Sequence, residues 1–112
     1  NVKKWLLNLT EADTILIHKS IKHASRVAKV EYTENILRAE NKGASPEELR
    51  ALTRGVSGRE AFEISDFSHV SITVGQAVGL IHDIPSVKEI IDRIINEGEI
   101  VMQRLNQAGT GR

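Results

Sequence analysis

Apolar positions along this chain recur mainly at the spacing of helices, most clearly over residues 86–105. Ser86, followed three residues later by Glu89, forms a capping box of the kind that starts a helix. A core-facing stripe at three-four spacing follows, made of Val87, Ile90, Ile91, Ile94, Ile95, Val101, Met102 and Leu105. Burial of one such side chain is worth about 1.5 to 3 kcal/mol. We therefore expect this helix to anchor the domain, with residues 107–112 as a frayed tail.

Two helical patterns lie in the first half of the chain. The first ends near Asn8, after apolar residues at helical spacing. The second covers residues 27–41, where apolar and charged positions alternate as they do in a surface helix. Gly43 follows it closely, which predicts a left-handed cap at that glycine.

Two short helices are predicted in the middle of the chain. Residues 45–48 combine a capping box with proline at the first helical position, and Gly55 ends this helix early. Residues 57–60 repeat the serine-to-glutamate box. It opens a short turn that we expect to carry three apolar side chains inward, those of Ala61, Phe62 and Ile64.

Two segments favour an extended backbone. Residues 14–17 are a short apolar, β-favouring run, which predicts a buried strand. In residues 70–74, valine and isoleucine alternate with hydroxyl residues, which predicts one buried face and one hydroxyl face. The period then changes, so residues 75–81 read as a tight turn or short helix, which Pro85 and the residue before it break. The whole pattern predicts a mainly α fold, as a small α+β domain over residues 1–112.

The composition narrows the classes of function. The 15 basic residues balance the 15 acidic ones, so no summed field attracts nucleic acid or an anionic membrane. The absence of cysteine excludes disulfides, thiolate nucleophiles and zinc-thiolate sites. No apolar run approaches the roughly 20 residues of a membrane span, and no signal peptide opens the chain. We expect a cytoplasmic protein without nucleic-acid or membrane partners, cut from a longer chain because it begins in helix-like sequence without methionine.

Catalytic and metal-binding patterns are weak. The chain lacks the Gly-x-Ser-x-Gly motif, and nothing local supports a catalytic triad. His18 and His23 are five residues apart, which is not the spacing that places two imidazoles on one helix face. His69 and His82 are isolated. We therefore predict no metal site and assign no catalytic residue.

Residues 18–26 form a basic stretch with two histidines. Such a stretch can contact a phosphate or an acidic neighbour, or it can be a solvated connector. Because it contains no glycine-rich loop and no aromatic residue, the connector is the preferred interpretation.

Residues 75–81 are the candidate for ligand contact. Gly75 and Gly79, four apart, let another backbone or a flat ligand come close. Between them, Gln76 has an amide whose donors and acceptors need partners among apolar neighbours. The polar groups of a flavin suit that amide, and so does ordinary backbone. We interpret the segment as a docking surface more than a catalytic centre.

The segment 70–87, and above all Gly75-Gln76-Ala77-Val78-Gly79-Leu80-Ile81-His82-Asp83-Ile84-Pro85, resembles the closing signature of FMN-dependent nitronate monooxygenases, formerly called 2-nitropropane dioxygenases. Residues 13–17, followed by the basic stretch that ends in residues 24–27, resemble the family's segment after its flavin barrel. In that family a TIM-type barrel binds FMN, and a smaller helical domain covers the active site.

The resemblance implies that this chain is the helical C-terminal cap domain of such an enzyme, without its barrel. Residues 1–12 would end the barrel region, residues 13–106 would form the cap and residues 107–112 the tail. Cofactor contact is implied for Gly75 and Gln76, and also for Ser71. The family's catalytic histidine and its glycine-rich phosphate loops belong to the barrel, and none of the four histidines here matches the catalytic one. The chain alone is therefore expected to bind FMN weakly or not at all and to turn over nothing.

The implied activity of the full-length protein is oxidation of alkyl nitronates by O2 to nitrite and a carbonyl compound. Related members reduce enoyl-acyl carrier protein, or quinones with NADH, and these reactions are alternatives. A further alternative is a helical interaction module without a cofactor. The implied partners are the small-molecule substrate and FMN, and self-association into a homo-oligomer is possible through apolar surface that the missing barrel leaves exposed.

Overall fold

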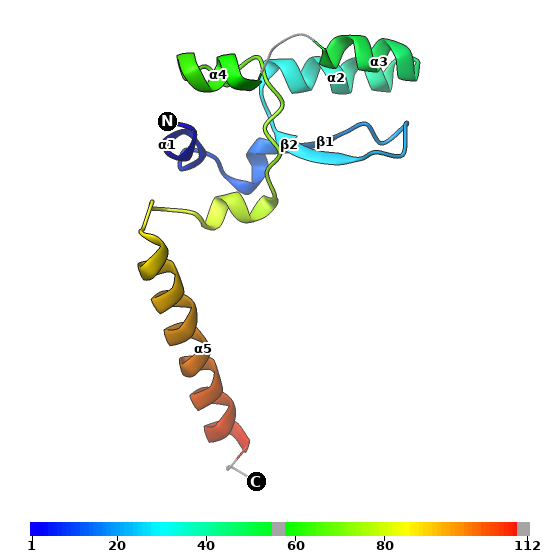
Figure 1. The fold of residues 1–112 in the computed structure, drawn as a ribbon. Helices are drawn as coiled ribbons and strands as arrows, with labels where there is room; N and C mark the ends of the chain where they lie inside the picture. The colour runs from blue at the N-terminus through cyan, green and yellow to red at the C-terminus, as the bar shows by residue number, and fades with distance from the viewer. Residues whose placement is uncertain (55–57, 110–112) are drawn as a thin grey trace. The chain divides into compact units, whose positions relative to one another are not determined.

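The computed structural model describes residues 1–54 and 58–109, and its contacts divide the chain into two compact units, Asn1–His82 and Asp83–Arg112. The described residues are mainly helical, with one two-stranded sheet and no barrel (Figure 1). The predicted fold class, mainly α with a small β component, is thus confirmed. The sequence predicts one domain over residues 1–112, with the cap beginning after residue 12 and the tail after residue 106. This division differs from the two contact-defined units and stays a prediction.

A β-hairpin forms the sheet. β1 (Thr14–Ile17) pairs antiparallel with β2 (Ser25–Ala28), in a register that runs from Thr14 opposite Ala28 to Ile17 opposite Ser25. β1 is the strand that the sequence predicts. β2 corrects the predicted helix over residues 27–41, because Val27 and Ala28 are buried in the sheet and α2 spans Glu31–Asn41.

Thr33 determines where α2 begins. Its hydroxyl accepts a hydrogen bond from the Val30 amide at 3.0 Å and donates one to the Ala28 carbonyl at 2.7 Å. The side chain is fully buried, so it joins the end of β2 to the first turn of α2. The helix cannot start earlier, because the backbone of residues 25–28 is committed to the sheet.

α2 and α3 (Pro46–Thr53) cover the hairpin and complete the first core. Gly43, two residues after the end of α2, has φ of +83°, which confirms the predicted left-handed cap. The Ser45 hydroxyl accepts a hydrogen bond from the Glu48 amide at 3.2 Å, which confirms the capping box. Gly55, the predicted end of α3, lies outside the described residues. The buried side chains of this core are those of Ile17, Val27, Ile36 and Leu49.

A second, smaller core joins α1 (Val2–Leu6), α4 (Gly58–Ile64) and the segment after α4. The rings of Trp5 and Phe67 lie 5.2 Å apart. Ala61 is buried as predicted, but Phe62 is 50% exposed and Ile64 is 66% exposed, so the prediction that both point inward is wrong. The reason is that α4 packs only one face, that of Ala61, against this core. The predicted box of residues 57–60 begins at a residue outside the described part.

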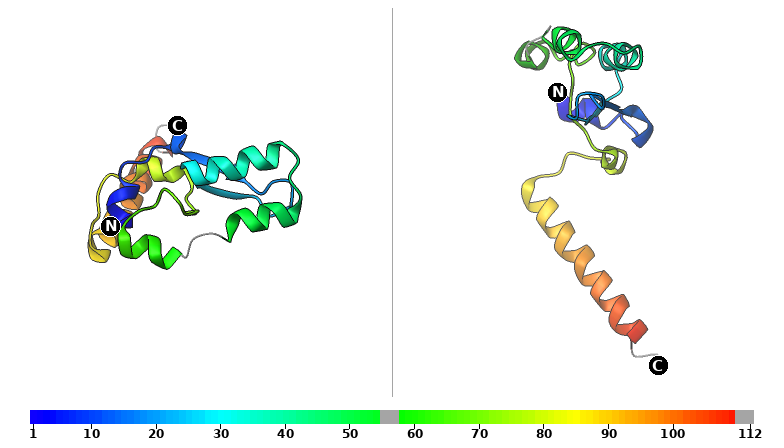
Figure 2. Two further views of the ribbon diagram at one scale, coloured as in Figure 1. Left: turned by 90° about the horizontal axis from the view of Figure 1, so that it is seen from above. Right: turned by 90° about the vertical axis from the view of Figure 1, so that its right-hand side faces the viewer.

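The second unit contains one long helix, α5 (Val87–Gly109), which Figure 2 shows as a continuous ribbon. The amide of Ser86 donates to Glu89 Oε2 at 2.7 Å, which confirms the predicted cap. The expected anchoring stripe is not buried: its eight side chains are 43% to 74% exposed, because the described residues of this unit, 83–109, form no second helix or strand to cover them. The helix also continues through Gly109, which corrects the tail predicted from residue 107. Residues 110–112 lie outside the described part.

Candidate functional site

The candidate site begins with an extended segment, residues 72–74, along the edge of β2 that does not pair with β1. The amide of Ala28 donates to the Ile72 carbonyl at 2.9 Å, and the amide of Val74 donates to the Arg26 carbonyl at 3.2 Å. Thr73 lies opposite Val27 in an antiparallel bridge. These bonds hold residues 72–74 against the hairpin, so the position of the following turn is set by the first core.

The predicted alternation in this segment is confirmed. Val70 is buried, and Ile72 and Val74 are half-buried, whereas Ser71 and Thr73 are exposed. The apolar side chains therefore attach the segment to the protein, and the hydroxyl groups face solvent. A hydroxyl can both donate and accept a hydrogen bond, so this face suits a ligand with polar edges.

The two glycines of the turn have different surroundings. At Gly79, a Cβ atom would lie 2.6 Å from Glu11 Oε2 and 2.9 Å from the Glu11 backbone nitrogen. Gly79 therefore allows close contact between η2 (Gln76–Leu80) and η1 (Glu11–Asp13) inside the unit. At Gly75, the nearest atom to such a Cβ is the Ala77 backbone nitrogen at 3.9 Å, an ordinary van der Waals contact, so the fold does not require a glycine here for lack of space.

Gln76 is exposed at the start of η2, and its amide makes no hydrogen bond to any residue that the structure describes. Ala77 is also exposed, and Leu80 is 79% exposed, whereas Val78 is buried and holds the turn in place. Ser71, Gly75 and Gln76, the three predicted cofactor contacts, thus all lie exposed within six residues of one segment. Their role as cofactor contacts stays a prediction.

Arg26 was missed by the sequence analysis as a neighbour of this segment. It is half-buried, its Nη1 donates to Thr14 Oγ1 at 2.9 Å, and its carbonyl holds Val74 one residue before Gly75. The pairing of β2 with residues 72–74 creates this proximity. The only signal in the sequence was the basic character of residues 18–26. That signal does not show which of these basic residues lies next to residues 72–74.

The arrangement can bind and orient a ligand, but it offers no obvious acid-base chemistry. Within the described residues, no group of three histidine, aspartate or glutamate side chains could hold a metal ion. His69 Nε2 lies 3.9 Å from Asp66 Oδ2, in an exposed pair on the loop after α4. None of the described helices combines the length and the hydropathy that crossing a membrane requires.

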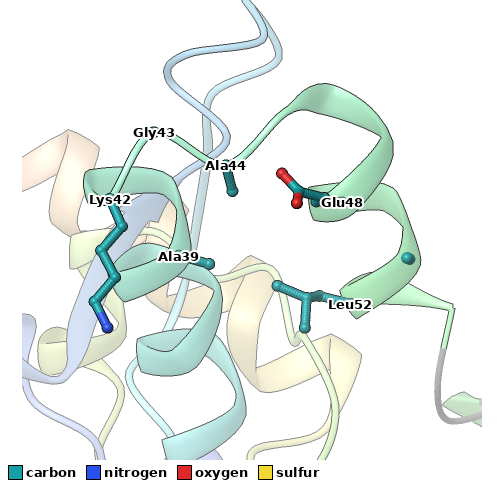
Figure 3. Close-up of a pocket in the computed structure, with 7 residues that line it drawn as sticks. Ala39, Lys42, Gly43, Ala44, Glu48 and Leu52 are labelled. Carbon is teal, nitrogen blue, oxygen red and sulfur yellow. The ribbon is translucent and has the colours of Figure 1, made fainter.

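A shallow pocket lies elsewhere, between the end of α2 and α3 (Figure 3). Ala39, Ala44 and Leu52 supply apolar surface, and Lys42 and Glu48 lie at its sides. It contains none of the predicted contact residues, so it is separate from the candidate site.

Comparison with known proteins identifies similar folds. No family model matches the chain. The chain is similar to FabK from Thermotoga maritima, with 28% sequence identity and a TM-score of 0.79, over 95% of this chain and 33% of FabK. A single-residue mutant of the same FabK matches with 25% identity and a TM-score of 0.63, over 93% of this chain and 30% of the other. The chain spans about a third of the length of the solved structures that it matches.

Proposed function

We propose that this chain is the C-terminal part of a flavin-dependent oxidoreductase of the FabK type, whose full-length form reduces enoyl-acyl carrier protein. The observation that carries the proposal is the likeness to FabK, which extends over nearly the whole chain at 28% identity. The closing signature alone favours nitronate oxidation, with this reaction as an alternative. The match to FabK, in two structures, favours enoyl reduction instead.

The proposed role of this chain is to hold and cover part of an FMN cofactor. Ser71, Gly75 and Gln76 would contact it, through a hydroxyl group, a close backbone approach and an amide. Support comes from the exposure of all three residues on a segment that the first core holds in place. FMN, when bound, supplies the redox chemistry, and these residues contribute orientation and exclusion of water.

A second candidate is oxidation of alkyl nitronates by O2 to nitrite and a carbonyl compound, the reaction that the closing signature implies most directly. The resemblance of residues 75–85 to nitronate monooxygenases supports it. Reduction of quinones by NADH stays a third alternative within the same flavin-dependent group.

The test uses a full-length protein that contains these 112 residues. Purified protein is expected to carry FMN, seen as flavin absorbance, and to consume NADH when an enoyl thioester is added. Nitrite release from a nitronate without NADH consumption would favour the second candidate. A colourless full-length protein that turns over none of these substrates would leave the helical interaction module as the better explanation.

A matched pair of variants tests the proposed contacts. Gln76→Ala is expected to weaken FMN binding about tenfold, because an amide that hydrogen-bonds a buried ligand contributes about 1 to 1.5 kcal/mol. Gln103→Ala, at an exposed residue of α5, is the control and should leave FMN affinity unchanged. Equal affinity in both variants would remove Gln76 from the site.

A further inference from the structure

The hairpin concentrates positive charge in a chain that is neutral as a whole. Residues 14–30 contain four of the 15 Lys and Arg residues and none of the 15 acidic residues. Two of the four histidines lie in the same stretch. Lys29 pairs with Glu34 at 3.9 Å, and Arg26 is half-buried. The exposed positive charge of this stretch that has no acidic partner among the described residues is therefore that of Lys19 and Lys22.

The end of the hairpin is a defined turn over residues 18–24 that connects β1 to β2, in line with the preferred interpretation as a solvated connector. The last two residues of the basic stretch, Ser25 and Arg26, belong to β2 instead. The amide of His23 donates to the His18 carbonyl at 3.3 Å, and the amide of Lys22 donates to the Lys19 carbonyl at 3.3 Å. His18 and Lys22 have positive φ, 61° and 57°. Residues other than glycine adopt this conformation at a cost, so other contacts must hold the turn.

Glu40 of α2 provides one of those contacts. Its carboxylate accepts hydrogen bonds from the His18 amide at 2.9 Å, the Ser20 amide at 2.6 Å and the Ser20 hydroxyl at 2.8 Å. Burial opposes the ionisation of this 8% exposed residue, but the bonds from Ser20 and His18 and the positive charge of His18 prevail, so the pKa of Glu40 is lowered. The carboxylate is turned toward the turn's backbone, and it forms no ion pair with Lys19 or Lys22.

Ile21 provides the second contact, because it packs against the first core. Lys19, Lys22 and His23 are left exposed, and we call these three residues the basic tip. Within residues 1–54 and 58–109, neither Lys19 nor Lys22 forms an ion pair. A fixed, unpaired cationic surface binds an acidic partner with less ordering cost than a flexible loop does.

We propose that the basic tip is a docking surface for an acidic protein. The proposal rests on the proposed function, in which this partner is the acyl carrier protein that bears the enoyl substrate. A nucleic acid fits less well, because residues 14–30 contain no aromatic side chain on which bases could stack. Two lysines in a neutral chain also provide few phosphate contacts.

The experiment compares two substrates of the full-length enzyme, enoyl-acyl carrier protein and an uncharged enoyl thioester of N-acetylcysteamine. Lys19→Glu combined with Lys22→Glu is expected to raise KM for the carrier-protein substrate about tenfold and to reduce its dependence on salt. Both kcat and KM for the uncharged thioester should stay unchanged. The control is Lys3→Glu combined with Lys4→Glu, the same charge change on exposed residues of α1, which should affect neither substrate.

Several results would overturn the proposal. An unchanged KM for the carrier-protein substrate would do so, as would an equal rise with the uncharged thioester or an equal rise in the control variant. If the wild-type enzyme reduces neither substrate, the proposed function fails, and binding is measured with poly-glutamate, duplex DNA and phosphatidylglycerol vesicles. Binding of poly-glutamate that depends on the two lysines supports the docking surface. Lysine-dependent binding to DNA or vesicles alone, or to none of the probes, overturns it.

Discussion

The first core and α5 have equally clear apolar patterns but opposite burial. Ile17, Val27, Ile36 and Leu49 are at most 1% exposed, because the hairpin, α2 and α3 cover one another. The stripe of α5 has more apolar residues, and all of them are exposed. A periodic pattern therefore identifies the face that should be buried, but it does not identify what buries that face. Whether such a face is buried depends on contacts between residues that are far apart in sequence.

The largest expected contrast between the two regions comes from truncating one side chain in each. Leu49→Ala should lower the free energy of unfolding by about 2 to 5 kcal/mol, because Leu49 is 0% exposed and its loss leaves a cavity. Ile94→Ala, at a site 65% exposed, should change it by no more than about 0.5 kcal/mol. Urea unfolding of the 112-residue chain measures both values.

The same pair of variants shows whether another surface covers α5. In a full-length protein that buries the stripe, Ile94→Ala should become nearly as costly as Leu49→Ala. A large, concentration-dependent effect of Ile94→Ala in the 112-residue chain would instead indicate self-association through α5, the predicted homo-oligomer. That result would contradict the expectation that α5 is uncovered in this chain alone.

The second prediction concerns the carboxylate that holds the hairpin turn. Glu40→Gln should lower the free energy of unfolding by about 1.5 to 3 kcal/mol at neutral pH, since it weakens hydrogen bonds to a charged, buried acceptor. Because the pKa of Glu40 is lowered in the folded state, its contribution is present above its ordinary pKa and disappears as the pH falls through the folded-state value.

The pH dependence separates this contribution from simple loss of packing. Wild-type stability should decline as the pH falls below about 4.3, and the difference between wild type and Glu40→Gln should shrink over the same range. Chemical unfolding at several pH values measures it. Glu63→Gln, at an exposed residue of α4, is the control. A difference that is the same at every pH would contradict the assigned role of the charge.

The third prediction compares the two glycines of the candidate site. Gly79→Ala should lower the free energy of unfolding by about 1 to 3 kcal/mol, because the new methyl group would overlap the Glu11 backbone nitrogen at 2.9 Å. Gly75→Ala places its methyl group 3.9 Å from the Ala77 backbone nitrogen, an ordinary contact distance, and should have a small effect on stability. In the full-length protein the order should reverse for FMN affinity, because only Gly75 lies on the exposed side. Equal effects of the two substitutions would remove the distinction.

Local signals explain what could be predicted from the sequence. The caps at Ser45 and Ser86 and the left-handed Gly43 depend on residues within a turn of each other, and the structure contains all three. β2 could not be predicted in this way. Its residues look like a basic connector and the start of a helix, and only their pairing with residues 14–17 and 72–74 makes them a strand.

In the candidate site, too, features that depend on neighbouring residues could be predicted, and features that depend on distant residues could not. The exposure of Ser71 follows from an alternation over five residues, so the sequence contains it. The closeness of Arg26 to the turn, and the use of Gly79 for contact with η1, depend on segments more than 45 residues apart and had no local signal. The basic tip had a charge signal, but its rigidity depends on Glu40, in a different element.

The smallest expected contrast comes from the two serine caps, which have the same local geometry in the two regions. Ser45→Ala should lower the free energy of unfolding by about 1 kcal/mol, because α3 carries Leu49 into the first core and frays only when that core opens. Ser86→Ala removes an equivalent cap, but α5 has no buried residue through which its fraying could reach the core. It should therefore reduce helical circular dichroism at 222 nm without moving the urea midpoint. An equal shift of the midpoint by both substitutions would mean that α5 unfolds together with the first core, and that the two regions are not energetically separate.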